Sequence, residues 1–378
     1  MKKIHILIIT LLVSFVLASC DNNNPPNGLE PLKAYEGCEI STLDNGYVCV
    51  WADEFEGDTL DTEKWNVEIS GSGGGNQELQ YYTRQNITVE GGLLKITAKN
   101  EDYLGKRYTS GRINSRYRGE TTYGRIEAAI QVPTGRGTWS AFWMLPTNNT
   151  YGGWPNSGEI DIMEHVGYAP NEVHASTHTT KFNHQNNAGA LTFSKSLFEA
   201  TTRLNVYALE WVPGEMKMFV NDQLIGTFGY NPVFNQDIPY DDVYPFESVF
   251  HIILNLAIGG NWGGVNGVDD SIFPVHMLVD YVRIYQKDYA TLDETAPEAP
   301  INLRQMTVLR RGMFWSPSVD DTHVEKYEVY VDDELYKETK LNQFTFTTLP
   351  SGTYQIKVRA VDFTGRTSPF SEPFTLTI

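Results

Sequence analysis

Three carboxylates within six residues constrain this chain most strongly, and they are Glu159, Asp161 and Glu164. Side chains of an extended strand alternate between its two faces, so Glu159 and Asp161 share one face. Glu164 follows Asp161 by three residues and reaches that face only if the strand absorbs one extra residue. We therefore predict a β-bulge at Ile162 and Met163.

A bulged strand would bring the two outer acids together over one substrate bond. With four effective steps of about 3.3 Å, the Cα atoms of Glu159 and Glu164 lie roughly 13 Å apart, and their long side chains can lean together over Asp161. Carboxyl groups about 5 to 5.5 Å apart are typical of glycosidases that retain the anomeric configuration. A solvated strand face and a structural metal site are the alternative interpretations of the cluster.

The residues around the acids add a family resemblance. Residues 154–158 precede the acids and residues 165–167 follow them. Further matching segments are residues 51–55, 76–82, 108–113, 123–128, 139–146, 253–262 and 280–285. In this order the segments resemble glycoside hydrolase family 16, most closely its laminarinase-like branch, over residues 47–286. Members carry either a Glu-x-Asp-x-Glu motif or a bulged Glu-x-Asp-x-x-Glu motif, and this chain has the bulged form.

The resemblance implies a role for each acid. Glu159 would be the nucleophile, Glu164 the general acid and base, and Asp161 the carboxylate that helps to set their charge states. The physical reason for the cluster is that Glu164 must hold a proton at working pH, and two anionic neighbours raise its pKa.

Sugar recognition requires flat apolar surfaces for the rings and polar groups for the hydroxyls. Three tryptophans match cleft-lining positions of the family, with burial in the core as the alternative: Trp139, Trp143 and Trp154. Core-like alternation surrounds three others, Trp51, Trp65 and Trp211. Weaker candidates for hydroxyl contacts, each of which could instead satisfy a buried turn or sheet edge, are Asn76, Glu78, Arg112, His178, Asn261 and Trp262.

The sequence predicts no cofactor for catalysis. The resemblance implies a structural calcium on the side opposite the cleft, at Glu56, Gly92 and Asp280, because backbone and carboxylate oxygens are suitable hard ligands. The glycine run at residues 71–75 lacks the Lys-Ser/Thr and the helix of a phosphate loop, so we expect a flexible loop at the cleft rim.

The N-terminus predicts export. Two lysines and an apolar stretch at residues 4–16 precede Leu17-Ala18-Ser19-Cys20, which is similar to a bacterial lipobox. We expect a signal peptide at residues 1–19, a lipid anchor on Cys20 and a polar tether at residues 20–34. The alternative is an ordinary secretory signal with an incidental cysteine. The expected location is the cell envelope, on the outer membrane or cell surface, with a periplasmic or secreted protein as the variants.

The two remaining cysteines suit an oxidising compartment. Cys38 and Cys49 flank Asp44-Asn45-Gly46, a strong hairpin signal, and could meet across two antiparallel arms as a disulfide. Two inert buried thiols are the alternative.

Composition narrows the partners. The formal net charge of -18 opposes binding to phosphate backbones and predicts no nucleic-acid partner. The same charge weakly disfavours sulfated polysaccharides, so a neutral β-glucan is the expected substrate. We expect a monomer, held at the membrane through Cys20.

Hydrophobic periodicity predicts an all-β chain. Alternation at residues 125–132 and apolar runs at 249–258 and 278–285 indicate strands, with hairpin turns at 90–92 and 221–222. We expect a catalytic domain at residues 35–288 made of two stacked antiparallel sheets, which the resemblance specifies as a jelly-roll sandwich with a concave cleft.

The chain changes character at a proline-containing linker, residues 289–300. Residues 301–378 look like a fibronectin type III or related immunoglobulin-like sandwich, with Trp315 in its core and a tyrosine corner ending at Tyr354. A spacer or docking role suits this domain better than carbohydrate binding, because it shows no row of aromatic residues.

The function that these features predict is a retaining, endo-acting hydrolase of β-1,3 or mixed β-1,3-1,4 glucans. One alternative is a surface glycan-binding protein without turnover. Another is a hydrolase of agar or carrageenan galactans, which related family members cut with the same acid motif.

Overall fold

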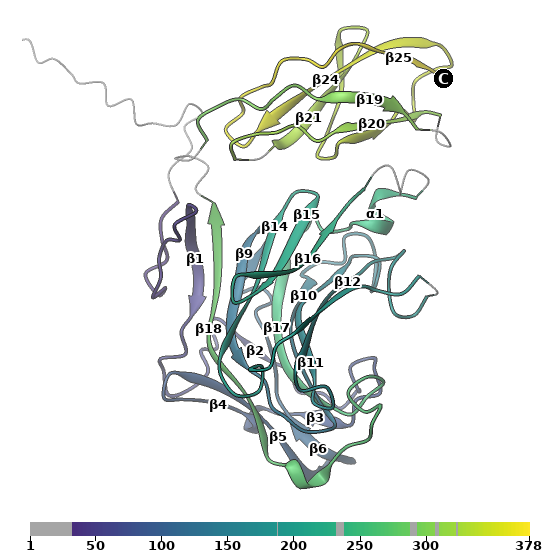
Figure 1. The fold of residues 1–378 in the computed structure, drawn as a ribbon. Coiled ribbons are helices and arrows are strands. Elements are labelled where there is room, and N and C mark those ends of the chain that lie inside the picture. The colour runs from purple at the N-terminus through teal and green to yellow at the C-terminus, as the bar shows by residue number, and fades with distance from the viewer. Residues whose placement is uncertain (1–31, 187, 232–237, 288–292, 307–309, 323) are drawn as a thin grey trace, which may run out of the picture.

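The computed structural model describes residues 32–186, 188–231, 238–287, 293–306, 310–322 and 324–378. The expected signal peptide, Cys20 and the first part of the expected linker lie outside these ranges. Strands dominate throughout, and Figure 1 shows them gathered into a larger body and a smaller C-terminal domain.

Two stacked sheets form the larger body. The first has the order β16 (Gln223–Gly229), β15 (Glu215–Val220), β14 (Asn205–Val212), β9 (Gly124–Gln131), β18 (Val275–Lys287), β5 (Leu93–Tyr103), β6 (Lys106–Ser110) and β3 (Gln80–Tyr82), with β1 (Tyr47–Asp53) beside β18 and β4 (Ile87–Glu90) beside β5. The second has the order β13 (Leu191–Ser196), β12 (Glu172–His178), β11 (Glu159–Val166), β10 (Thr138–Pro146), β17 (Phe250–Ile258), β7 (Arg112–Asn114) and β2 (Asn66–Val67), with β8 (Glu120–Thr121) beside β17. All these pairs are antiparallel except β3 with β6. The short helices are α1 (Tyr240–Val243), η1 (Arg84–Asn86) and η2 (Asp270–Ile272).

Apolar side chains from both sheets pack into one core, which confirms the predicted sandwich. Ile126 and Ile130 of β9 belong to the same buried cluster as Phe142 of β10 and Ile160 of β11. Strand β17 is buried along its whole length, as its apolar run suggests. Of the helices in the described residues, none is long and apolar enough to span a membrane.

Strand β9 departs from simple alternation. An alternating strand should expose one face, but Arg125 and Glu127 are both buried. Arg125 Nε lies 2.8 Å from Glu127 Oε2, and its guanidinium also reaches Glu210 at 3.0 Å. This pairing explains how a polar face can lie under cover, since buried charges require partners.

The predicted disulfide is present. Cys38 and Cys49 are bonded, with their Cα atoms 6.5 Å apart, across a hairpin in which Leu43 N donates to Tyr47 O. Cys49 belongs to β1, so the bond fastens the N-terminal arm to the first sheet.

The C-terminal domain is also a two-sheet sandwich. One sheet has the order β19 (Ile301–Gln305), β20 (Gly312–Ser316) and β23 (Gln343–Thr345), and the other has β22 (Glu334–Thr339), β21 (Val324–Val331), β24 (Thr353–Asp362) and β25 (Phe374–Thr377). Trp315 is buried in its core, as predicted. Tyr354 OH donates to Pro350 O over 3.0 Å, which confirms the tyrosine corner.

Candidate active site

The acid run forms β11, and the predicted bulge is present. On β10, Trp143 pairs with Asp161 while the adjacent Phe142 pairs with Met163. Ile162 is therefore the extra residue, and the pairing with β12 also shifts between Asp161 and Glu164. Ile162 and Met163 are both buried in the core. The strand can then present all three acids to the opposite face.

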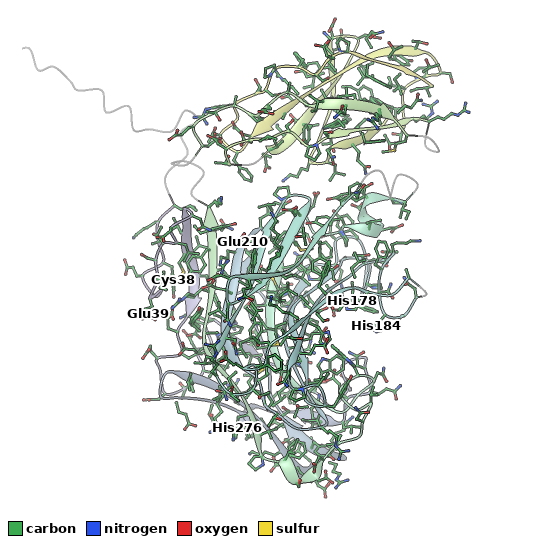
Figure 2. All side chains as sticks on the ribbon, viewed as in Figure 1. Cys38, Glu39, His178, His184, Glu210 and His276 are labelled. Carbon is green, nitrogen blue, oxygen red and sulfur yellow. A yellow bond between two sulfur atoms is a disulfide. The ribbon has the colours of Figure 1, made fainter. Side chains whose placement is uncertain are left out.

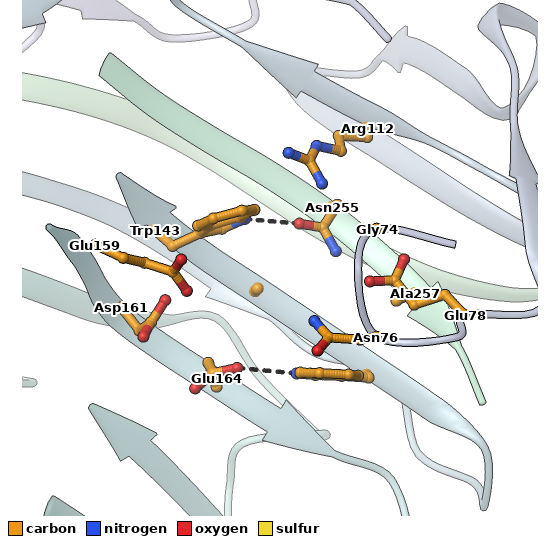
Figure 3. A pocket seen from close by; sticks show the side chains of 12 residues that line it. Gly74, Asn76, Glu78, Arg112, Trp143, Glu159, Asp161, Glu164, Asn255 and Ala257 are labelled. Carbon is orange, nitrogen blue, oxygen red and sulfur yellow. Dashed lines mark hydrogen bonds between the residues drawn. The ribbon is translucent and has the colours of Figure 1, made fainter. Parts of the chain in front are cut away.

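The acids line one pocket on the second sheet (Figure 3). Its other lining residues are Gly74, Asn76, Glu78, Arg112, Trp139, Ala141, Trp143, Asn255 and Ala257. Two neighbouring hollows share Glu68, Arg112 and Trp154 and extend the depression past Glu159. The three together form an elongated cleft with the acids in its wall.

A tryptophan N–H holds each outer acid. Trp154 Nε1 donates to Glu159 Oε2 over 2.5 Å, and Trp139 Nε1 donates to Glu164 Oε1 over 3.0 Å. Both rings come from positions that the sequence assigns to the cleft. They therefore orient the acids in addition to offering apolar surface.

His178 lies against the acids. It pairs with Glu159 across the β11–β12 ladder, and its Nε2 is 3.2 Å from Asp161 Oδ2 and 3.9 Å from Glu159 Oε1. The contact with Asp161 lacks the alignment of a hydrogen bond, because Asp161 Oδ2 has no such partner. The side chain of His178 is nearly fully buried, so it acts on the carboxylates more directly than on a sugar hydroxyl.

Glu159, Asp161 and His178 also form a chemically reasonable cation site. One ligand atom from each lies within 4.8 Å of the others. Carboxylate and imidazole ligands suit several divalent metals. The metal-site interpretation of the acid run is thus a specific alternative that chelation can test.

Burial sets the protonation of the cluster. It raises the pKa of Glu159 to about 8, with a further increase from Asp161, and raises that of Asp161 to about 7. Burial also raises the pKa of Glu164 well above its ordinary value, followed by the charges of Asp161 and Glu159. The charges of both other acids raise the pKa of Glu164, so it is the carboxyl best suited to keep a proton, and Glu159 becomes the anion in those molecules in which it has lost its own proton beside the Trp154 N–H.

The remaining sugar-contact candidates divide into two groups. Asn76, Glu78 and Arg112 line the pocket, as predicted. Arg112 Nε lies 2.8 Å from Glu68 Oε2, and its guanidinium stands 4.8 Å from the centroid of the Trp143 ring. This arrangement fixes the guanidinium against an aromatic face.

Asn261 and Trp262 are not among the residues that line that pocket, but both contact residues that do. Trp262 packs edge-on against Trp139 and against His174, with centroids 5.6 and 4.9 Å away. The backbone N–H of Asn261 donates to the backbone carbonyl oxygen of Asn76 over 2.8 Å.

The sequence did not identify several residues of the cleft, namely Glu68, His184, Gln185 and Asn255, whereas Gly74 belongs to the glycine run that it placed at the cleft rim. Asn255 had a usable signal, since it interrupts an apolar strand, and it accepts from Trp143 Nε1 over 2.7 Å. No sequence signal could have identified His184, because it lies in a loop. Its ring is 5.1 Å from Trp154 and 5.2 Å from His178, and Figure 2 shows the two histidines close together.

The calcium candidates lie near one another around β18. Asp280 has no partner residue in the pairing of β18 with β9. Glu56 lies close to Gly92, because its Oε1 is 3.7 Å from the position that a Cβ would take on Gly92. Burial raises the pKa of Asp280, with contributions from the charges of Glu54, Glu39 and Glu56. Arg283 pairs with Glu54 and Glu39 and lowers the pKa of Asp280, so the oxygens of Glu56, Asp280 and the Gly92 backbone are the donors that remain for a hard cation.

Two family models match the sequence. The model described as Glycosyl hydrolases family 16 matches residues 75–283, and one described as Y_Y_Y domain matches residues 326–378. The chain is similar to a beta-glucanase of Rhodothermus marinus, with 46% identity over 246 residues that cover 63% of this chain and 84% of that protein. It is 35% identical over 264 residues to glucan endo-1,3-beta-glucosidase A1 of Niallia circulans, covering 64% of this chain but 38% of that longer protein.

A solved structure agrees as well. The laminarinase of Rhodothermus marinus superposes with a TM-score of 0.61 at 46% identity, over 64% of this chain and 97% of that one. The family model covers more than half of the residues. The chain therefore belongs to glycoside hydrolase family 16.

Proposed function

We propose that this protein is an endo-acting hydrolase that cleaves internal β-1,3 or mixed β-1,3-1,4 linkages of neutral glucans with retention of configuration. The observation that carries the proposal is the pair of outer acids, each held by a tryptophan N–H on one face of a bulged strand within an elongated cleft. The names of the two relatives support the glucan substrate.

In the first step, the bond between the anomeric carbon and the glycosidic oxygen breaks. Glu164 gives its proton to the leaving oxygen while Glu159 attacks the anomeric carbon and forms a glycosyl ester. Trp154 Nε1 orients the attacking carboxylate, because it donates to Glu159 Oε2.

In the second step, water hydrolyses the glycosyl ester. Glu164, now anionic, accepts a proton from the water that attacks the anomeric carbon, and Glu159 leaves as a carboxylate. Asp161 lies beside both acids, and its charge raises the pKa of Glu164 and so favours the return of the proton to it.

The sugars would lie along the cleft on aromatic and polar groups. The Trp143 ring offers an apolar face, and its N–H is already hydrogen-bonded to Asn255. The side chains of Arg112 and Asn76 offer hydrogen-bond donors for sugar hydroxyls. The depression continues past Trp154 toward Asn149 and Arg116, which suits a chain bound across the acids and cut internally.

Azide rescue tests the two roles. Glu159→Ala should yield the α-glycosyl azide and Glu164→Ala the β-glycosyl azide, and the opposite anomers would exchange the assigned roles. A panel of laminarin, barley glucan, lichenan, agarose and carrageenan, with product sizing, tests the substrate. A wild-type protein that releases no reducing sugar but is retarded in glucan gels would be a binding protein instead.

Chelation distinguishes the two possible cation sites. A structural calcium at Glu56, Gly92 and Asp280 predicts that EDTA lowers the melting temperature and removes calcium detected by atomic emission. A metal held by Glu159, Asp161 and His178 would occupy the nucleophile, so its removal predicts a gain of turnover together with a lower melting temperature. If EDTA changes neither metal content nor melting, the calcium proposal is wrong.

The lipobox-like segment supports export and a lipid anchor on Cys20, which would place the enzyme in the cell envelope. We propose that the enzyme is a monomer there. Two sandwich domains, the second fibronectin type III-like, would extend from this anchor. Cys20→Ala should abolish metabolic labelling with palmitate and release the protein from membranes. Unchanged labelling would contradict the assignment.

A further inference from the structure

The C-terminal domain touches the catalytic body at an aromatic surface. Tyr230 OH donates to Gln343 Oε1 over 2.7 Å, and Lys340 Nζ stands 5.9 Å from the centroid of the Tyr123 ring. The charges of Lys340 and Glu325 also act on Glu247 of the catalytic body. Figure 1 shows the small domain at the end of the body that carries α1.

A row of rings leads from this contact toward the active site. Tyr230 packs on Tyr240 at 4.7 Å between centroids, Tyr240 on Tyr244 at 5.8 Å, and Tyr244 on Phe246 at 5.1 Å. Phe246 reaches Gly158, where an added Cβ would lie 2.7 Å from a ring carbon. Gly158 has φ of +85° and immediately precedes Glu159. The last ring therefore packs directly against the entry to the catalytic strand.

A second connection runs from α1 to the loop that carries His184. The Lys181 amide donates to Asp242 O, in α1, over 2.7 Å. The same loop is tied to the Trp154 loop, because Thr180 Oγ1 donates to Asn156 Oδ1 over 3.2 Å. The two loops at this end of the cleft thus both contact the segment 240–246, and that segment packs against the residue that contacts the C-terminal domain.

We propose that the C-terminal domain is a brace for the cleft: by docking on Tyr230 and Tyr123 it holds the segment 240–246, and through it the loops that carry Trp154 and His184. Its binding partner is the surface of its own catalytic body. The assignment rests on contacts within this chain and does not depend on which glucan is cleaved.

Hydrogen–deuterium exchange on the full chain tests the brace. Lys340→Glu replaces the cation beside Glu247 with an acid and should loosen the docking, and Tyr230→Phe removes only the hydroxyl that Gln343 accepts from. In both variants, peptides covering residues 147–158 and 179–186 should exchange several-fold faster, with a larger effect for Lys340→Glu. Lys337→Glu is the control, since it makes the same charge change at an exposed position of β22.

Faster exchange in the interface peptides alone, with both cleft loops unchanged, would show docking without bracing and overturn the proposal. Unchanged exchange everywhere would overturn the docking itself. Exchange that rises equally in Lys337→Glu would assign the effect to charge and not to the interface. In the active enzyme, the brace also predicts that Lys340→Glu lowers kcat and raises KM together, because the Trp154 loop holds both a ring of the cleft and the N–H that donates to Glu159.

Discussion

At the residue scale, the central feature is that the tryptophan that donates a hydrogen bond to each outer acid also lies at the cleft. Trp154 is partly exposed in the cleft and at the same time donates to Glu159. In the proposed mechanism, a ring that supports a sugar would thereby also orient the nucleophile. Three buried carboxyls at such close range oppose one another when ionised, so the site is built at the expense of stability.

Replacing Glu159 with Gln should stabilise the protein at alkaline pH. Because burial raises the pKa of Glu159 to about 8, the folded state keeps a proton that the unfolded chain loses near its ordinary pKa of 4.5. The wild type therefore loses stability as pH rises from about 4.5 to about 8, whereas Gln has no proton to lose. Thermal unfolding should show a melting-temperature advantage of a few degrees for Glu159→Gln at pH 8 that shrinks toward pH 4.5. The exposed Glu36→Gln should follow the wild type throughout, and a constant advantage at every pH would contradict the linkage.

Trp154→Phe separates the two roles of that ring. Phenylalanine keeps an aromatic face but has no N–H, and a hydrogen bond to a charged group is worth about 1.5–3 kcal/mol, so kcat should fall at least ~10-fold with a smaller change in KM. Trp154→Ala should in addition raise KM. An unchanged kcat in Trp154→Phe would show that the N–H is unimportant, whereas equal effects of the two substitutions would show that the ring face is unimportant.

At the element scale, the N-terminal hairpin is fastened to the first sheet through Cys38 and Cys49, while the acids lie on the second. Its contribution should therefore appear in stability and not in turnover. Strand β1 adds a neighbour to β18, so the hairpin covers an edge that would otherwise expose backbone groups.

The double variant Cys38→Ser/Cys49→Ser should lower the free energy of unfolding by about 2–3 kcal/mol, as expected for the entropy of a short closed loop. Its kcat at a temperature well below melting should match that of the wild type. Denaturant unfolding measures the first quantity and initial rates measure the second. A large loss of kcat at full folding would place the hairpin in the catalytic machinery.

At the scale of the whole molecule, the net charge of -18 surrounds a site that must receive a polymer. A neutral glucan is indifferent to this field, whereas a sulfated one is repelled over about 10 Å at 0.1 M salt. We expect kcat/KM on chemically sulfated laminarin to rise steeply with added NaCl while that on laminarin stays nearly constant. Sulfated laminarin cleaved as well as laminarin at low salt would point to a basic cleft that overrides the surface charge.

The sequence predicted the features that depend on neighbours along the chain. The phase of Asp161 and Glu164 specified the bulge, and alternation specified the strands. It could not place His184 or Glu68, because their positions depend on how loops and separate strands meet in space. The sequence did not predict the burial of Arg125 and Glu127 for the same reason. Glu210 on β14 and Asp222 in the β15–β16 turn pair with Arg125 and allow these charged side chains to be buried.

The bulge has a consequence for how this strand can vary. Ile162 and Met163 are consecutive, yet both point into the core, so the extra residue is anchored by its own side chain. Removing one residue from the run would delete a packed side chain and shift the strand ladder on both sides, whereas exchanging Ile162 for a residue of similar volume would leave the acids in place. Core substitutions in this strand should therefore be tolerated when they preserve side-chain volume, whereas insertions and deletions should not be tolerated. Among homologous proteins, the spacing of the acids should then vary less than the identity of the residues between them.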